Sequence, residues 1–183
     1  MEIKLQAPFG KNDIKDLKAG DNVLISGIII AARDAAHKRL MDAYNNNLEI
    51  PIDLKNQVIY YLGPSPAKPG EVIGAAGPTT SGRMDKYTPM MLDLGISAMI
   101  GKGYRNEDVI KSIINHGAIY MVAIGGAGAL IANSIKSYTI LAYEDLGAVA
   151  IAKLEVVDFP AIVVIDSNGN NFYEIGQKQY RVE

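Results

Sequence analysis

Short β-rich runs alternate with segments of helical periodicity along this chain, and that alternation constrains its fold more than any other feature. The run at 23–30 is apolar on both faces, which is typical of a strand buried in a parallel sheet. A helix is predicted directly after it, at 35–44, with Asp34 as its N-cap or first-turn acid. One face of this helix carries Ala36, Leu40, Ala43 and Tyr44. Strands followed by helices predict an α/β fold.

The rest of the chain extends the pattern and ends in a different one. We predict strands at 58–62, 72–76, 96–100 and 119–124, helices at 84–94 (kinked by Pro89) and 106–116, and a helix start at 129–133. Asn106 and Gly117 have the residue types expected at the two ends of the second helix. Further β-rich runs follow at 135–142, 151–157, 161–165 and 172–175, the last two joined as a hairpin by the turn at 166–170. We therefore expect a mixed sheet. Since a domain typically has about 150 residues, we also expect a single domain that spans residues 1–183.

Composition excludes several classes of protein. With 18 basic and 20 acidic residues the formal net charge is −2, which lacks the basic excess of a general nucleic-acid binder. No cysteine is present, so neither a disulfide scaffold nor a cysteine-ligated cluster can form within this chain alone. His37 and His116 are too few for a three-histidine metal site. Neither a signal peptide nor an apolar run of membrane-spanning length is recognisable, and we expect a soluble, cytoplasmic protein.

Basic residues occur in three loops that each follow a predicted strand. Arg33 follows the first strand, Thr79 to Arg83 follow the strand at 72–76, and Lys102 follows the strand at 96–100. Ligands of open α/β sheets bind beyond the carboxyl ends of the strands, and such cations suit a carboxylate or a phosphate. Taken singly, each cation is more typical of a solvated loop residue or a surface ion pair, and only their coincidence in three loops favours a ligand site. A nucleotide site is disfavoured because the glycines at 125–128 do not complete a G-x-G-x-x-G motif and no GK[ST] occurs.

One segment carries a resemblance to a known family. Residues 77–85 read GPTTSGRMD, and they resemble the C-terminal domain of the class I (iron–sulfur) fumarases and the β subunit of L-tartrate dehydratase. Further matching segments follow the family's order along nearly the whole chain: 32–39, 63–64, 101–103, 116–126, 143–147 and 159–161. The chain begins about where that C-terminal domain would begin, so it resembles a free β subunit. The resemblance implies a swivelling β/β/α domain.

The resemblance also implies an activity, a cofactor and a partner. The activity is the reversible hydration of fumarate to L-malate, or its tartrate equivalent. A [4Fe–4S] cluster, held by three cysteines of a partner α subunit, would act as Lewis acid on a dicarboxylate substrate. The expected assembly is α2β2, without nucleic acid or membrane. Since part of the site would belong to the partner, this chain alone should be inactive.

Matched to the family's motifs, four residues acquire expected roles. Thr79 takes the position of the catalytic base, and Arg83 that of the arginine beside it, which also binds substrate. Arg33 and Lys102 match the other substrate-carboxylate and charge-stabilising positions. A threonine hydroxyl is a poor base, so nearby cations must stabilise its alkoxide, and we expect Arg83 to do so. No metal ligand is expected on this chain. Two alternatives stay open: an L-tartrate dehydratase β subunit, or a non-catalytic carboxylate-binding module.

Overall fold

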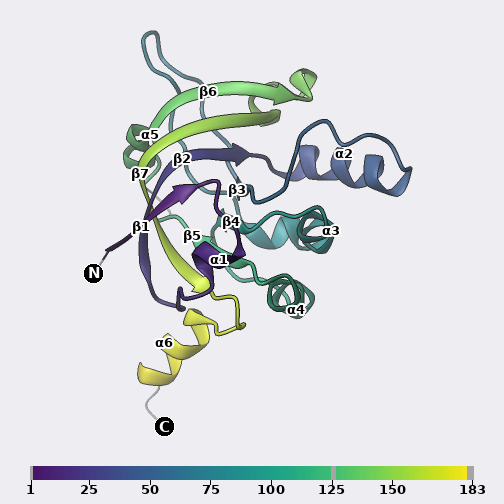
Figure 1. The fold of residues 1–183 in the computed structure, drawn as a ribbon. Helices are drawn as coiled ribbons and strands as arrows, with labels where there is room; N and C mark the ends of the chain where they lie inside the picture. Colours follow the sequence, from purple (N-terminus) through teal and green to yellow (C-terminus); the bar gives the residue numbers. More distant parts are fainter. Residues whose placement is uncertain (1, 125–126, 181–183) are drawn as a thin grey trace.

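Seven strands and six α-helices make up the described part of the chain, residues 2–124 and 127–180 of a computed structural model (Figure 1). The strands are β1 (Glu2–Ala7), β2 (Asn22–Ala31), β3 (Val58–Tyr60), β4 (Ala98–Gly101), β5 (Ile119–Val122), β6 (Ile135–Ala142) and β7 (Ile151–Ile165). The helices are α1 (Lys11–Ile14), α2 (Asp34–Asn45), α3 (Thr88–Asp93), α4 (Glu107–His116), α5 (Gly128–Ser134) and α6 (Phe172–Tyr180), with 3-10 helices η1 (Ser81–Tyr87) and η2 (Glu144–Val149). Within these residues no helix has the length and apolar character needed to cross a membrane.

The strands pair into a mixed sheet that closes on itself. Parallel pairing joins β1 to β2 and runs on through β2, β3, β4 and β5. The long strand β7 lies antiparallel to β2, β5 and β6. Because β7 pairs with both β2 and β5, the five strands β2, β3, β4, β5 and β7 form a closed circuit. This confirms the predicted α/β fold with a mixed sheet and agrees with a β/β/α domain.

Alternate side chains of the central strands enter two separate hydrophobic cores. Val58 and Tyr60 of β3 belong to one core, which also holds side chains of β1, β2, β5 and β7. Ile59 and Tyr61 point the other way and join a second core under α2, α3 and α4. Figure 1 shows these three helices gathered on one side of the strands. A strand that is buried on both faces explains the continuous apolar run of the sequence.

The local signals of the sequence located most elements within a few residues. Strands are confirmed at 23–30, 58–62, 96–100, 119–124 and 135–142, and helices at 35–44 and 106–116. The Asn106 side chain accepts a hydrogen bond from Val109 N at 2.9 Å, and Gly117 ends the helix with a φ of 61°. In α2 the buried face contains Ala36, Leu40 and Ala43 as predicted, whereas Tyr44 is 43% exposed. Residues 125–126 of the glycine-rich segment at 125–128 lie outside the described residues.

Three predictions about strands were wrong. Residues 72–76 form no strand, because Ala75 N and Ala76 N donate to the Ser65 hydroxyl and to the carbonyl of Gly128 instead. The runs at 151–157 and 161–165 are one strand, β7, which continues through Pro160. Residues 172–175 belong to helix α6, where the Asn171 side chain accepts a hydrogen bond from Tyr173 N.

The predicted helix at 84–94 begins later than expected. Residues 81–87 form the 3-10 helix η1, and α3 starts at Thr88. Pro89 therefore occupies the first turn of α3, where its missing N–H costs no hydrogen bond, and does not kink a longer helix.

Candidate functional site

The carboxyl ends of β2, β3 and β4 meet at one edge of the sheet because the three strands run parallel. Ala31 of β2 lies beside Tyr60 of β3, and Tyr60 lies beside Ile100 of β4. Backbone hydrogen bonds continue just beyond the strands, from Ala32 N to Tyr60 O (3.1 Å) and from Tyr61 N to Ile100 O (2.9 Å). This pairing brings together the loops that carry three of the predicted site segments.

The Thr79 loop is fastened across these strand ends by its backbone. Thr79 N donates to Tyr61 O at 2.7 Å, and Leu62 pairs with Pro78 in an isolated antiparallel bridge. On the other side, Ser81 N donates to Lys102 O at 2.9 Å. Thr79 is consequently only 8% exposed, and its backbone is fixed to the strand ends.

Arg33 is the cation that reaches Thr79. Its Nη1 donates to Thr79 Oγ1 at 3.3 Å, across 46 residues of sequence. Arg33 directly precedes α2, and its carbonyl oxygen accepts a hydrogen bond from His37 N at 2.9 Å. A half-buried guanidinium against a nearly buried hydroxyl forms a local positive site.

Arg83 does not lie where we expected it. Its guanidinium forms an ion pair with Oδ2 of Asp34, and its side chain is 54% exposed. The residue that the sequence placed beside Thr79 therefore lies at the rim, and Arg33 takes the place beside the hydroxyl. The other carboxylate oxygen of Asp34, Oδ1, is buried and has no hydrogen-bond partner among the described residues. The sequence predicted Asp34 only as the N-cap or first-turn acid of the helix, and it is indeed the acidic residue of the first turn of α2.

Lys102 joins the site through its backbone. Besides accepting the hydrogen bond from Ser81 N, it pairs with Thr80 in an isolated parallel bridge. Its side chain is exposed, and its ammonium forms no ion pair with any residue that the structure describes. The ammonium is therefore available to an anionic ligand at this edge.

A buried ion pair stabilises the Thr79 loop. The Arg105 side chain is 0% exposed, and its Nε donates to Asp85 Oδ1 at 2.6 Å. Asp85 Oδ2 accepts a hydrogen bond from Asn106 N, and Arg105 Nη2 donates to Thr88 Oγ1. Asp85, the last residue of the GPTTSGRMD segment, thus holds η1 against the start of α4. Nothing in the sequence marks Arg105 as its partner, because their contact is set by tertiary packing.

Aromatic rings complete this support. The Arg105 guanidinium lies 4.9 Å from the ring centroid of Tyr120 and 5.5 Å from that of Tyr61. Tyr120 OH donates to Ser81 Oγ at 2.8 Å. Nothing in the sequence singles out either tyrosine, since both stand in strand runs where aromatic residues are common.

His37 is a buried, neutral residue behind Arg33. It is 1% exposed, and its Nδ1–H donates to the Arg33 carbonyl at 2.9 Å. Burial lowers the pKa of His37 to about 4, although the hydrogen bond to Arg33 opposes this shift. The imidazole therefore adds no positive charge to the site at neutral pH.

The residues of this chain do not fit an iron–sulfur cluster. The sequence has no cysteine, and no three His, Asp or Glu side chains of residues 2–124 and 127–180 lie close enough together to hold a metal ion. What these residues do fit is an anion, because backbone pairing brings the segments that carry Thr79, two arginines and a lysine to one sheet edge.

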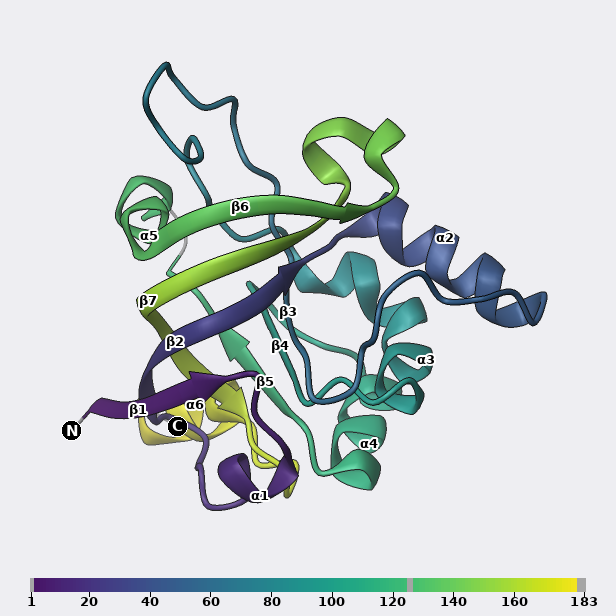
Figure 2. The ribbon, with the colours of Figure 1, turned by 45° about the horizontal axis from the view of Figure 1, so that its top comes forward.

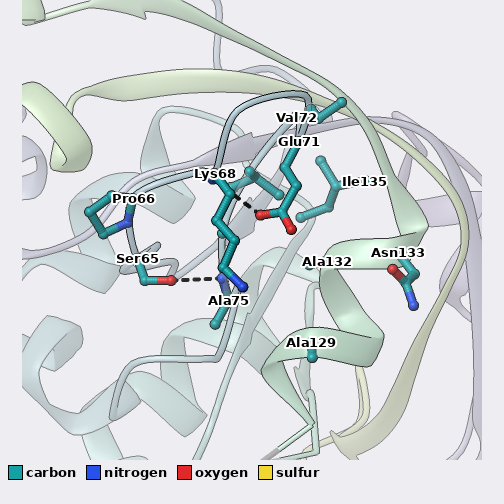
Figure 3. A pocket seen from close by; sticks show the side chains of 12 residues that line it. Ser65, Pro66, Lys68, Glu71, Val72, Ala75, Ala129, Ala132, Asn133 and Ile135 are labelled. Carbon is teal, nitrogen blue, oxygen red and sulfur yellow. Dashed lines mark hydrogen bonds between the residues drawn. The ribbon is translucent and has the colours of Figure 1, made fainter.

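A pocket of about 560 Å³ lies elsewhere, between the loop at 65–75 and α5 with Ile135 (Figure 3). Figure 2 shows that this loop extends beyond β6. Its polar groups bond within the loop, Ala75 N to Ser65 Oγ and Lys68 N to the Glu71 carboxylate. None of the four predicted site residues lines the pocket.

Comparison with known proteins identifies relatives of the whole chain. The profile of the family described as Fumarase C-terminus matches residues 1–176. The chain is 37% identical over 177 residues to "Fumarate hydratase 2" of Leishmania major, covering 94% of this chain and 31% of that protein. It is 41% identical over 152 residues to "Fumarate hydratase class I, anaerobic" of Escherichia coli (strain K12), covering 82% and 28%.

A shorter relative matches over most of its own length. "Putative L(+)-tartrate dehydratase subunit beta" of Methanocaldococcus jannaschii is 39% identical over 177 residues, covering 93% of this chain and 91% of that protein. The chain thus spans about a third of the length of the fumarate hydratases and nearly all of this subunit.

Proposed function

The chain belongs to the fumarase C-terminus family, and on that premise we propose that it is the β subunit of a two-subunit iron–sulfur hydro-lyase that reversibly hydrates fumarate to L-malate. The observation that carries the proposal is the hydrogen bond from Arg33 Nη1 to Thr79 Oγ1 at 3.3 Å, at the edge where three parallel strands end. A guanidinium against a fixed threonine hydroxyl provides what an alkoxide base requires.

In this proposal the four residues divide three tasks among them. Thr79 removes the proton from the carbon next to the leaving hydroxyl. Arg33 stabilises the Thr79 alkoxide and the negative charge that develops on the substrate. Arg83 and Lys102 bind the substrate carboxylates, with Arg83 exchanging its Asp34 partner for a carboxylate of the ligand.

The remaining parts of the site belong to a partner. The 183 residues of this sequence contain no cysteine to ligate a [4Fe–4S] cluster, and the fumarate hydratases named above are about three times as long. We assign the cluster and the acid that protonates the leaving hydroxyl to an α subunit in an α2β2 complex. The contribution of this chain is the base and the cations.

A second candidate is the β subunit of an L-tartrate dehydratase. It is favoured by the match over most of the length of a relative with that name. Both candidates use the same reaction type on a small dicarboxylate. They differ in the substrate, so an assay on both substrates separates them.

The test is an assay of the assembled complex. The chain is co-expressed with the product of the adjacent gene, the cluster is reconstituted anaerobically, and turnover is measured on malate, fumarate and both tartrates. Turnover on malate and fumarate supports the first candidate, and turnover on a tartrate alone supports the second. Substrate binding without turnover on any of them would indicate a non-catalytic carboxylate-binding module.

A substitution at Thr79 tests the proposed base. Thr79→Val keeps the shape of the side chain and removes its oxygen, so kcat should fall by about 10²-fold or more. Thr79→Ser should retain part of the activity. The matched control is the exposed neighbour, Thr80→Val, which should have a milder effect. Wild-type turnover of Thr79→Val together with loss in Thr80→Val would assign the role to Thr80.

A further inference from the structure

Gly63 lies where any side chain would displace Arg33. A Cβ placed on Gly63 would overlap Nη1 of Arg33, and it would lie 3.0 Å from Cζ of Arg33 and 3.5 Å from Oγ1 of Thr79. The missing side chain of Gly63 therefore leaves the space that the guanidinium occupies where it meets the hydroxyl.

The backbone does not itself require glycine at this position. Eight glycines of the described residues have positive φ, and Gly63 is not among them. Pro64 follows, and a residue before proline favours the extended conformation that side chains tolerate well. Glycine is therefore required here not by the backbone conformation but by the space that the Arg33 guanidinium occupies.

A side chain at position 63 would displace the Arg33 guanidinium and not the surrounding backbone. Thr79 N is bonded to Tyr61 O at 2.7 Å, and the residues next to Thr79 and Gly63 are joined by the Leu62–Pro78 bridge. The segments on which Gly63 and Thr79 lie are thus fixed to each other. The overlapping atom, in contrast, belongs to the far end of a flexible side chain, which can rotate away at little cost to the fold.

We propose that Gly63 is a positioning residue of the catalytic site: it directs the Arg33 guanidinium onto the Thr79 hydroxyl by having no side chain. The inference rests on the proposed function for its effect on turnover. A single methyl group at position 63 should separate Arg33 from Thr79 and leave the sheet and both cores intact.

Gly77 provides a matched control in the same loop. A Cβ on Gly77 would meet no atom within 4 Å, and its φ is not positive either. Gly63→Ala and Gly77→Ala therefore make the same chemical change at two positions between β3 and η1. They differ in whether the new methyl group meets Arg33.

The experiment compares Gly63→Ala, Gly77→Ala, Arg33→Ala and the double variant Gly63→Ala/Arg33→Ala in the reconstituted complex. Gly63→Ala should lower kcat by about 10- to 100-fold, the scale of a misplaced catalytic group, with a thermal midpoint close to that of the wild type. Gly77→Ala should have wild-type turnover. In the Arg33→Ala background, adding Gly63→Ala should have no further effect, because no guanidinium remains to be displaced.

A second measurement does not depend on turnover. In ¹⁵N-labelled protein the Nε–Hε resonance of Arg33, assigned by its loss in Arg33→Ala, should shift in Gly63→Ala and stay in place in Gly77→Ala. An unchanged Arg33 resonance in Gly63→Ala overturns the inference. So does a loss of activity from Gly63→Ala that persists in the Arg33→Ala background, since that loss does not act through Arg33. If Arg33→Ala itself has wild-type turnover, the proposed role of Arg33 fails, and the resonance still decides whether Gly63 positions it.

Discussion

The buried ion pair between Arg105 and Asp85 should hold the loop of the candidate site in place, and Asp85→Asn tests this. Asparagine keeps the shape of the side chain and an oxygen that can accept the hydrogen bond from Asn106 N. It removes the negative charge next to a guanidinium that is 0% exposed. Burial by itself lowers the pKa of Arg105, but Tyr61 and Asp85 outweigh it and raise the pKa, so the charge persists.

The size of the effect follows from that burial. Removing one partner of a buried pair leaves an uncompensated charge and costs about 3–5 kcal/mol of unfolding free energy. For a chain of this size, about 2–4 °C of thermal midpoint corresponds to each kcal/mol. Asp85→Asn should therefore lower the midpoint by roughly 6–20 °C.

Thermal unfolding followed by far-UV circular dichroism measures this difference. The control is Asp145→Asn, which breaks the exposed pair of Asp145 with Arg39 and should leave the midpoint close to that of the wild type. A midpoint of Asp85→Asn equal to that of the control would refute the reasoning, since the Arg105 charge would then be compensated otherwise. A stable but inactive Asp85→Asn complex would instead give Asp85 a role in the reaction.

Two further predictions concern Arg33 and His37. Arg33→Ala should lower kcat/KM of the reconstituted complex by about 30-fold or more, the equivalent of ~2 kcal/mol, and Lys102→Ala should act in the same direction with less dependence on substrate geometry. Because the pKa of His37 is about 4 in the folded chain and near 6.5 when unfolded, the unfolded state alone takes up a proton between these values, so stability falls as pH is lowered from 6.5 to 4. The free energy of unfolding, measured with urea at pH 7 and at pH 4.5, should decrease between these two values in the wild type. In His37→Leu the decrease should be smaller by about 2 kcal/mol.

Local sequence signals were sufficient for most elements of the fold. The β-rich run at 23–30 and the helix caps at Asn106 and Gly117 depend on neighbouring residues, and the structure has them as predicted. Parallel strands also bring the loops after β2, β3 and β4 to one edge, so Arg33 and Lys102, chosen for their positions after predicted strands, both lie there. Thr79 was expected after a strand at 72–76 that does not form, and its loop follows β3 instead.

The wrong predictions depend on distant or competing contacts. At 72–76 the apolar residues suggested a strand, but the partners of this backbone are the Ser65 side chain and Gly128. At 172–175 the turn residues before it suggested a hairpin, but the Asn171 side chain accepts a hydrogen bond from Tyr173 N and a helix follows. In both places a short β-rich run was outweighed by a hydrogen bond that composition does not reveal.

The choice between Arg33 and Arg83 as neighbour of Thr79 shows how topology overrides adjacency in sequence. Arg83 comes only four positions after Thr79 in the sequence. The 3-10 helix η1, however, buries Ser81, Met84 and Asp85 and leaves Arg83 exposed on its outer side, where it pairs with Asp34.

Arg33 is 46 residues from Thr79, yet the parallel pairing of β2 with β3 brings the two together. A cation held beside the hydroxyl before substrate arrives needs no reorganisation in the transition state, which suits the stabilisation of an alkoxide. An exposed cation whose present partner is a carboxylate suits the capture of a substrate carboxylate. In the proposed reaction, therefore, the more distant arginine in sequence assists the chemistry, and the adjacent one binds the ligand.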